Sequence, residues 1–180
     1  EASVADADEL LRTFSSLLKI ARIESGSYKP SFERIDFAPL IFDAADLYQG
    51  LAHEKGLVLM TDCDPVIFIH GDRNLLFQAL SNLVDNAIKY SPEGGAVSVI
   101  GRRDGDHAEV IVTDVGNGIP ENERENVLER FSRLDQSRSL PGSGLGLSVV
   151  NAVVKAHEGQ LIFEDNNPGL KAVVKFSLVR

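Results

Sequence analysis

The alternation of apolar and polar residues divides the chain into a leading helix and a longer mixed region. Between Asp8 and Glu24, apolar residues recur every three or four positions, as along one face of a helix. This stripe consists of Leu10, Phe14, Leu17, Leu18 and Ala21. Because a lone helix of this length is marginal in water, we expect the stripe to pack against a partner helix, with docking on the chain's own domain as the alternative.

Gly26 and the residues after it mark the boundary between the two regions. Gly26 is a typical helix stop, and the glycine, serine and proline residues that follow the helix indicate a linker. We therefore divide the chain into a helical segment over residues 1–26, a linker over residues 27–31 and a folded domain over residues 32–180.

From Phe32 onward, the periodicity alternates between that of strands and that of helices. Strands are expected near residues 32–36, 58–63, 66–69, 96–102, 108–113, 160–164 and 171–178, and helices over 38–55, 73–90 and 145–156, with a short one after Pro120. Strands joined by a turn as tight as Arg103-Asp104-Gly105-Asp106 pair antiparallel. The pattern predicts an α/β (α+β) domain in which one sheet carries helices on one face.

Composition and charge narrow the class of protein. The 180 residues, 43% of them apolar, suffice for one good-sized core and an appendage. No apolar stretch is long enough to cross a bilayer, and the segment from Glu1 lacks the pattern of a signal peptide. The lone Cys63 favours a reducing compartment, and a net charge of −9 argues against nonspecific nucleic-acid binding. We expect a cytoplasmic segment without nucleic-acid or membrane contact of its own, with the cytoplasmic part of a membrane-anchored protein as the alternative.

The helix expected over residues 73–90 carries two asparagines on a polar stripe. Asp72 is a plausible N-cap, and Ser91-Pro92 ends the helix. The stripe consists of Gln78, Asn82, Asn86 and Lys89, whereas Leu76, Ala79, Leu80, Leu83, Val84, Ala87 and Ile88 form the buried face. Each asparagine costs about 0.5 kcal/mol relative to alanine inside a helix. Their carbonyl oxygens suit a Mg²⁺ ion held mainly by phosphates, which Lys89 also reaches; a solvated polar face is the alternative.

A second motif, Asp114-x-Gly116-x-Gly118, follows the apolar run Val110-Ile111-Val112. A carboxylate at a strand end accepts a hydrogen bond from the exocyclic amine of adenine, where guanine has a carbonyl. The glycines permit close approach of the backbone to a flat ring, and Ile119 covers its face. A polar Asp-x-Gly turn between two elements is the alternative.

A third motif, Gly142-x-Gly144-x-Gly146, leads into the last helix. The start of a helix presents free N–H groups and positive potential to an anion. Upstream, Arg130, Arg133 and Arg138 make the preceding loop suited to phosphate, so we expect a mobile lid. A solvated connector is the alternative. A dinucleotide fingerprint is disfavoured because no strand immediately precedes the glycines.

These motifs together resemble the ATP-site boxes of bacterial sensor histidine kinases, members of the GHKL/HATPase superfamily. The matching segments are residues 82–90 (NLVDNAIKY), 114–120 (DVGNGIP), 130–133 (RFSR) and 142–147 (GSGLGL), in the family's order and spacing. The resemblance runs from about Phe32 to the carboxyl end. It implies a two-layer α/β sandwich of a mixed, mostly antiparallel sheet packed on helices, the Bergerat-type ATP-binding fold, preceded by one amphipathic helix.

The resemblance implies a role for each matching residue. Asn86 would bind Mg²⁺ with support from Asn82, and Lys89 would contact phosphate, so that Asn86 and Lys89 are the expected catalytic residues. Asp114 would select adenine, and Phe131 would anchor the lid. The remaining residues expected at the ATP site are Tyr90, Gly116, Gly118, Ile119, Arg133, Gly142, Ser143, Gly144, Leu145, Gly146 and Leu147.

One departure from related ATPases bears on the reaction. Gyrase and the heat-shock chaperones resemble this fold but place a glutamate where Asn82 stands. Because an amide is not basic, Asn82 favours transfer of the phosphoryl group to another protein's side chain over hydrolysis. A hydrolytic ATPase and a nonenzymatic ATP-binding scaffold are the alternatives. For Asp85, next to Asn86 in sequence, we expect a surface role.

The resemblance also implies partners. The leading helix is similar to the second helix of the family's dimerization hairpin, which implies a homodimer in the intact protein, and a response-regulator receiver domain would accept the phosphoryl group. The family's acceptor histidine lies on the first hairpin helix, outside this sequence. We expect structural or surface roles for the four histidines present, His53, His70, His107 and His157.

Overall fold

The computed structural model describes residues 2–28, 30–132 and 143–179. Its helices are α1 (Ala2–Glu24), α2 (Phe37–Asp46), α3 (Gln49–Glu54), α4 (Arg73–Tyr90) and α5 (Gly146–Ala156), with short 3-10 helices η1 (Glu121–Glu123) and η2 (Asn126–Leu128). Its strands are β1 (Glu33–Asp36), β2 (Val58–Cys63), β3 (Phe68–Gly71), β4 (Ala96–Asp104), β5 (His107–Thr113), β6 (Gln160–Asp165) and β7 (Leu170–Ser177). No helix in these ranges is long and apolar enough to cross a membrane.

The sheet is mixed, with five strands in the order β2-β4-β5-β7-β6. β2 pairs parallel with β4, and the other neighbours pair antiparallel, including β4 and β5 across the predicted tight turn. The expectation of a single sheet is wrong, because β1 and β3 form a separate two-stranded sheet. Pro65 and the left-handed φ of 64° at Val66 turn the chain out of the path of β2 before β3 begins.

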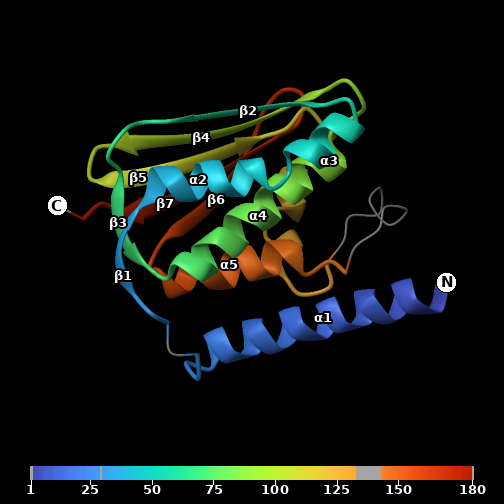
Figure 1. Ribbon diagram of the computed structural model, residues 1–180, viewed down its shortest axis with the longest axis horizontal. Coiled ribbons are helices and arrows are strands. Elements are labelled where there is room, and N and C mark those ends of the chain that lie inside the picture. The colour runs from blue at the N-terminus through green and yellow to red at the C-terminus, as the bar shows by residue number, and fades with distance from the viewer. Residues whose placement is uncertain (1, 29, 133–142, 180) are drawn as a thin grey trace.

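Helices α2, α4 and α5 cover one face of the sheet and form the second layer of the fold (Figure 1). The whole predicted apolar face of α4 is buried in the core between these layers. Asp72 caps α4 as expected, since its carboxylate accepts from the backbone N–H groups of Asn74 and Leu75. The two-layer sandwich predicted from the sequence is confirmed.

The single helix expected over residues 38–55 is two helices. α2 begins after the cap Asp36, and the backbone of Tyr48 leaves the helical region with φ −107° and ψ 1° before α3 begins. Gly50, near the start of α3, has a low helix propensity. Ala44 and Ala45 of α2 and Ala52 of α3 are buried on the two sides of this bend.

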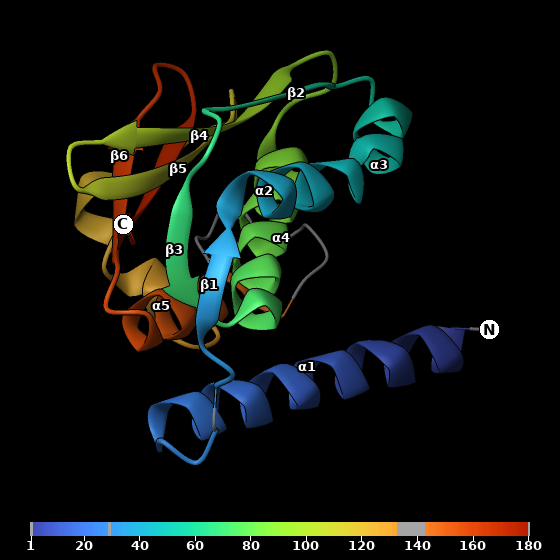
Figure 2. The ribbon, with the colours of Figure 1, turned by 60° about the vertical axis from the view of Figure 1, so that its left-hand side comes forward.

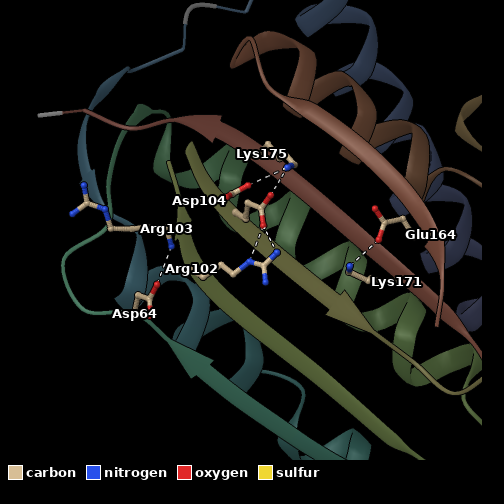
Figure 3. Close-up of polar contacts among 8 residues, drawn as sticks. Asp64, Arg102, Arg103, Asp104, Glu164, Lys171 and Lys175 are labelled. Carbon is tan, nitrogen blue, oxygen red and sulfur yellow. Dashed lines mark hydrogen bonds and ion pairs between the residues drawn. The ribbon is translucent and has the colours of Figure 1, made fainter. Parts of the chain in front are cut away.

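The face of the sheet away from the helices carries a network of ion pairs (Figure 3). Glu109 on β5 is buried there and accepts hydrogen bonds from Arg102 on β4 and Lys175 on β7. Burial opposes ionisation of Glu109, but the hydrogen bonds from Lys175 and Arg102 outweigh it, so its pKa lies below the usual value. These contacts join three neighbouring strands.

The helix α1 lies along the helical side of the domain (Figures 1 and 2). Ile20 is 0% exposed, and Leu17 and Ile23 also pack against the core of the domain. Of the predicted stripe, Leu17 alone among the described side chains packs on the domain, so docking on the chain's own domain involves a different face of α1, and the expectation of a partner helix for the stripe stays a prediction. Leu18 remains exposed, and Phe14 is 60% exposed.

The segment after α1 is attached to the start of α4 by polar contacts. The hydroxyl of Tyr28 and the backbone N–H of Ser31 both donate to the carboxylate of Asp72. His157 accepts from the N–H of Asp72 through Nε2 at 2.9 Å and donates from Nδ1 to the carbonyl of Val153 at 2.7 Å. Phe32 stacks on the His157 ring. The structural role expected for His157 is confirmed.

Candidate functional site

Asp114 lies directly after β5, and the backbone of two other segments holds its carboxylate. Oδ1 accepts from the N–H of Gly116 at 2.8 Å and from the N–H of Leu170 at 3.2 Å. Within the described residues, Oδ2 has no hydrogen-bond partner and is free to accept from a ligand. The side chain is only 6% exposed. A solvated polar turn, the alternative reading of this motif, does not fit a buried carboxylate.

Burial also sets the protonation behaviour of Asp114. Desolvation raises its pKa, and the hydrogen bonds from Gly116 and Leu170 oppose that rise. The backbone donors therefore help to keep a buried carboxylate available as an acceptor.

The glycines after Asp114 permit very close backbone packing. A Cβ atom on Gly116 would lie 2.4 Å from the carbonyl oxygen of Tyr90, at the end of α4. A Cβ atom on Gly118, which has a φ of 67°, would lie 2.9 Å from the carbonyl oxygen of Gly169. The sequence predicted close approach to a ligand ring, whereas the structure shows that both glycines first admit the chain's own backbone. Ile119 is buried next to them.

The polar stripe of α4 faces the start of α5. A Cβ atom on Gly146 would lie 3.5 Å from Nδ2 of Asn86 and 3.8 Å from Oδ1 of Asn82. Both asparagines are partly buried, which favours a packed role over the alternative of a solvated polar face. The first and third motifs, which are 60 residues apart in the sequence, therefore lie side by side.

Helix α5 begins without a side-chain cap. Leu145 occupies the N-cap position and is buried, and no side chain among the described residues accepts a hydrogen bond from the first N–H groups of α5. By contrast, Asp36 caps α2 and Asp72 caps α4. The first N–H groups of α5, next to Asn86, are therefore available to an anion. Ser143, Gly144 and Leu147, also predicted site residues, are partly buried around this helix start.

The last turn of α4 presents Lys89 and Tyr90. Nζ of Lys89 lies 5.0 Å from the centroid of the Tyr90 ring, within range of a cation–π contact. Lys55, which the sequence did not single out, donates from Nζ to the carbonyl oxygens of Ile88 at 2.7 Å and Lys89 at 2.8 Å. A cation at this position stabilises the free carbonyls at the end of a helix. No local pattern indicates a contact that spans 33 residues.

Asp85, for which we expected a surface role, is partly exposed. Its side chain is half-buried, and burial raises its pKa while the charge of Lys89 opposes the rise. The pKa of Tyr48 is raised by burial and by the charge of Asp85, so the two side chains are near one another. Asp85 therefore has charged or titratable neighbours on two sides, Lys89 one turn along α4 and Tyr48 between α2 and α3.

The lid residues are only partly within the described structure. Phe131 has a φ of 62° and is 58% exposed, and most of the lid that it was expected to anchor lies outside the described residues. Arg130 forms an ion pair with Glu24 at the end of α1. Arg133, Arg138 and Gly142 lie outside the described residues, and the expected lid stays a prediction.

The turn between β6 and β7 contributes site residues that sequence reasoning missed. Nδ2 of Asn166 donates to the backbone carbonyl of Asp114 at 2.8 Å. Arg124 donates to the carbonyl oxygens of Ile119 and Phe163 and pairs with Asp165. The pairing of β5 with β7 brings Asn166 close to Asp114, and that pairing cannot be read from the sequence alone.

A cavity of about 350 Å³ lies elsewhere, between α1 and α4. Lys19, Tyr28 and Gln78 are among the residues that line it, and Lys19 donates a hydrogen bond to Gln78. None of the predicted nucleotide-site residues lines this cavity.

Comparison with known proteins bears directly on this geometry. Residues 71–180 match the model of the family described as "Histidine kinase-, DNA gyrase B-, and HSP90-like ATPase". The chain is 34% identical over 163 residues to the sensor-like histidine kinase SenX3 of Mycolicibacterium smegmatis, covering 89% of this chain and 42% of that protein. It is 38% identical over 168 residues to the histidine-protein kinase/phosphatase MprB of the same organism, covering 92% of this chain and 33% of that protein.

Solved structures are similar over most of the chain. Full-length ShkA in complex with AMPPNP superposes with a TM-score of 0.85 at 26% identity, covering 97% of this chain and 37% of that one. A mycobacterial sensor histidine kinase MprB superposes with a TM-score of 0.75 at 34% identity, covering 81% of this chain and 98% of that one. The chain spans less than half the length of the full-length relatives it matches.

Proposed function

Because this chain belongs to the family of histidine kinase-, DNA gyrase B- and HSP90-like ATPases, we propose that it binds ATP with Mg²⁺ and transfers the γ-phosphoryl group to a histidine. The observation that carries the proposal is the convergence of the three motifs. Asn82 and Asn86 on α4 lie next to Gly146 at the start of α5. Gly116 packs on the carbonyl oxygen of Tyr90 at the end of α4. The last turns of α4 thus lie between a hydrogen-bond acceptor for adenine and hydrogen-bond donors for phosphate.

The adenine end fits a purine with an exocyclic amine. Oδ2 of Asp114 accepts from that amine, while the N–H groups of Gly116 and Leu170 hold Oδ1. Guanine offers a carbonyl at the same ring position, which would face a carboxylate oxygen. Asp114 therefore selects adenine in the proposed complex, and Ile119 and Tyr90 border the ring.

The phosphate end fits a triphosphate with a divalent cation. Asn86 would supply a carbonyl oxygen to Mg²⁺, and the neighbouring Asn82 would orient that amide. When bound, Mg²⁺ would neutralise charge on the triphosphate during transfer. Lys89 and the uncapped start of α5 add positive potential on the same side.

Transfer is favoured over hydrolysis by the amide of Asn82. An amide cannot take a proton from water, so the position that holds a base in hydrolytic relatives is chemically inert here. His157 cannot serve as the acceptor because both ring nitrogens are bonded inside the fold. We assign the acceptor to a histidine on a preceding hairpin helix, with a response-regulator aspartate as the next recipient.

Two further assignments follow from the proposed activity. The helix α1 is the second helix of a dimerization hairpin, and its exposed Leu11, Phe14 and Leu18 are the residues proposed to face the rest of that hairpin. We also propose that the domain acts in the cytoplasm, where response regulators and ATP are available.

Mixing this protein with a separate fragment that bears the acceptor histidine tests the proposal. With labelled ATP and Mg²⁺, we expect acid-labile label on the fragment and only slow phosphate release. Steady phosphate release without labelled histidine would instead indicate a hydrolytic ATPase, and Asn82→Glu should then raise that release further. Binding without either product would indicate a nonenzymatic scaffold.

A further inference from the structure

We propose that the β6–β7 turn, residues 166–169, positions Asp114 and that Asn166 is the side chain through which it sets adenine selectivity. The inference rests on the proposed function, because it concerns the same carboxylate. Asn166 is a positioning residue in this account, since it acts on the nucleotide only through Asp114.

Asn166 connects the turn to the strand that carries Asp114. Its Nδ2 donates to the backbone carbonyl of Asp114 at 2.8 Å, and its own N–H donates to the carbonyl of Gly169 at 3.0 Å. The side chain is partly buried, so water competes poorly for these groups. One residue thus closes the turn and anchors it to residue 114.

Gly169 brings the turn against the same peptide. Its φ of 110° is a conformation that favours glycine, and a Cβ atom there would lie 1.9 Å from the carbonyl oxygen of Asp114. The next residue, Leu170, exchanges backbone hydrogen bonds with Asp114: its carbonyl accepts from the N–H of Asp114 at 3.0 Å, and its N–H donates to Oδ1 at 3.2 Å.

The turn therefore controls both the backbone and the side chain of Asp114. The Asn166 amide fixes the carbonyl, and the Leu170 N–H occupies Oδ1, so that Oδ2 is the oxygen left to receive the purine. A small rotation at residue 114 would move Oδ2 away from an exocyclic amine. Removing the Asn166 donor is expected to permit that rotation without removing the carboxylate.

The test compares nucleotide selectivity in Asn166→Asp with that of the parent protein. This substitution keeps the side-chain size but replaces the donor with an acceptor that faces the carbonyl of Asp114. We expect the ratio of affinities for non-hydrolysable ATP and GTP analogues, measured by calorimetry, to fall about tenfold, the effect of one hydrogen bond. Asn166→Ala removes the donor without adding an acceptor and is expected to lower the ratio in the same direction.

Lys171→Met is the matched control. It breaks the ion pair with Glu164 in the same hairpin (Figure 3) without touching Asp114. We expect it to keep the parent's selectivity ratio even where it lowers the melting temperature. If both Asn166 variants bind nucleotide with the parent's ratio, or if Lys171→Met lowers the ratio equally, the inference is overturned while the proposed function stands. A parent that binds both purines equally overturns the assigned role of Asp114 and this inference together.

Discussion

The two ends of the candidate site are built in different ways. At the adenine end, backbone packs on backbone: Gly169 and Gly116 leave no room for a Cβ atom, and peptide N–H groups hold Asp114. At the phosphate end, side chains on α4 face Gly146 at ordinary van der Waals distances. The adenine end is therefore packed too tightly to accept an added methyl group, whereas the phosphate end has room for one between α4 and the start of α5.

The two ends of the site also differ in their electrostatics. The adenine end holds one buried carboxylate whose pKa is raised by desolvation. The free-energy cost of burying that group reduces the stability of the folded protein, with or without nucleotide. The phosphate end offers neutral amides, Lys89 and the first N–H groups of α5, which no described side chain caps and which gain most when an anion binds. Added bulk should therefore lower stability at the adenine end, whereas removing a polar side chain at the phosphate end should weaken binding without lowering stability.

The largest expected effect is the difference in stability between two glycine-to-alanine substitutions, one at each end of the site. Gly169→Ala should lower the free energy of unfolding by about 3 kcal/mol, since its Cβ atom would collide with the Asp114 peptide at a strained φ. Gly146→Ala should change it by less than about 1 kcal/mol, because its Cβ atom has ordinary contacts and alanine favours helices. Chemical denaturation measures both, and equal losses would contradict the contrast between the two ends.

The next largest effect is a loss of nucleotide binding that is not accompanied by a loss of stability. Asn86→Ala should leave the free protein as stable as before, or more stable by about 0.5 kcal/mol, because alanine is the better helix former. It should weaken Mg²⁺-dependent binding of an ATP analogue about 30-fold, in line with the loss of a contact to a charged group. Asn74→Ala, on the exposed first turn of the same helix, is the matched control. Unchanged binding by Asn86→Ala would remove this residue from the phosphate end.

The smallest expected effect is a dependence of stability on pH, caused by His157, which joins the end of α5 to Asp72 at the start of α4. Burial lowers the pKa of His157 below its usual 6.5, so the unfolded chain binds more protons than the folded protein at mildly acidic pH. The stability that neutral His157 provides is complete above pH 6.5 and is lost as the pH falls toward the folded-state pKa, by at most about 1.4 kcal/mol per pH unit.

Denaturation at pH 7.5 and at pH values below 6.5 measures this loss. His157→Gln removes the titrating group and should flatten the dependence on pH. His107→Gln serves as the control for the loss of an exposed histidine. A steep dependence that persists in His157→Gln would assign the acid sensitivity to another group and not to the contact between α4 and α5.

The sequence predicted the parts of the site that are local. The capped helix with Asn82 and Asn86, the strand before Asp114 and the glycines before α5 are all patterns within a few residues. What it missed depends on contacts between distant segments: Lys55 at the end of α4 and Asn166 on Asp114 become neighbours only in the folded chain.

The errors have the same origin. The break between α2 and α3 and the separate β1–β3 sheet are consequences of packing that hydrophobic periodicity does not encode. The periodicity of α1 indicated an apolar stripe but not which face of the helix packs on the domain. Ile20, the residue of α1 that is most completely buried there, was not in the predicted stripe.

Calorimetric titration of the parent and of Asp114→Ala with adenine and guanine triphosphate analogues, each with and without Mg²⁺, tests the convergence of the three motifs most directly. We expect the parent to prefer the adenine compound and to bind it more tightly with Mg²⁺. Asp114→Ala should lose roughly tenfold or more of that affinity, the range for a hydrogen bond to a charged group, and should bind the two purines equally. A parent without purine preference, or an Asp114→Ala protein that retains it, would contradict the account.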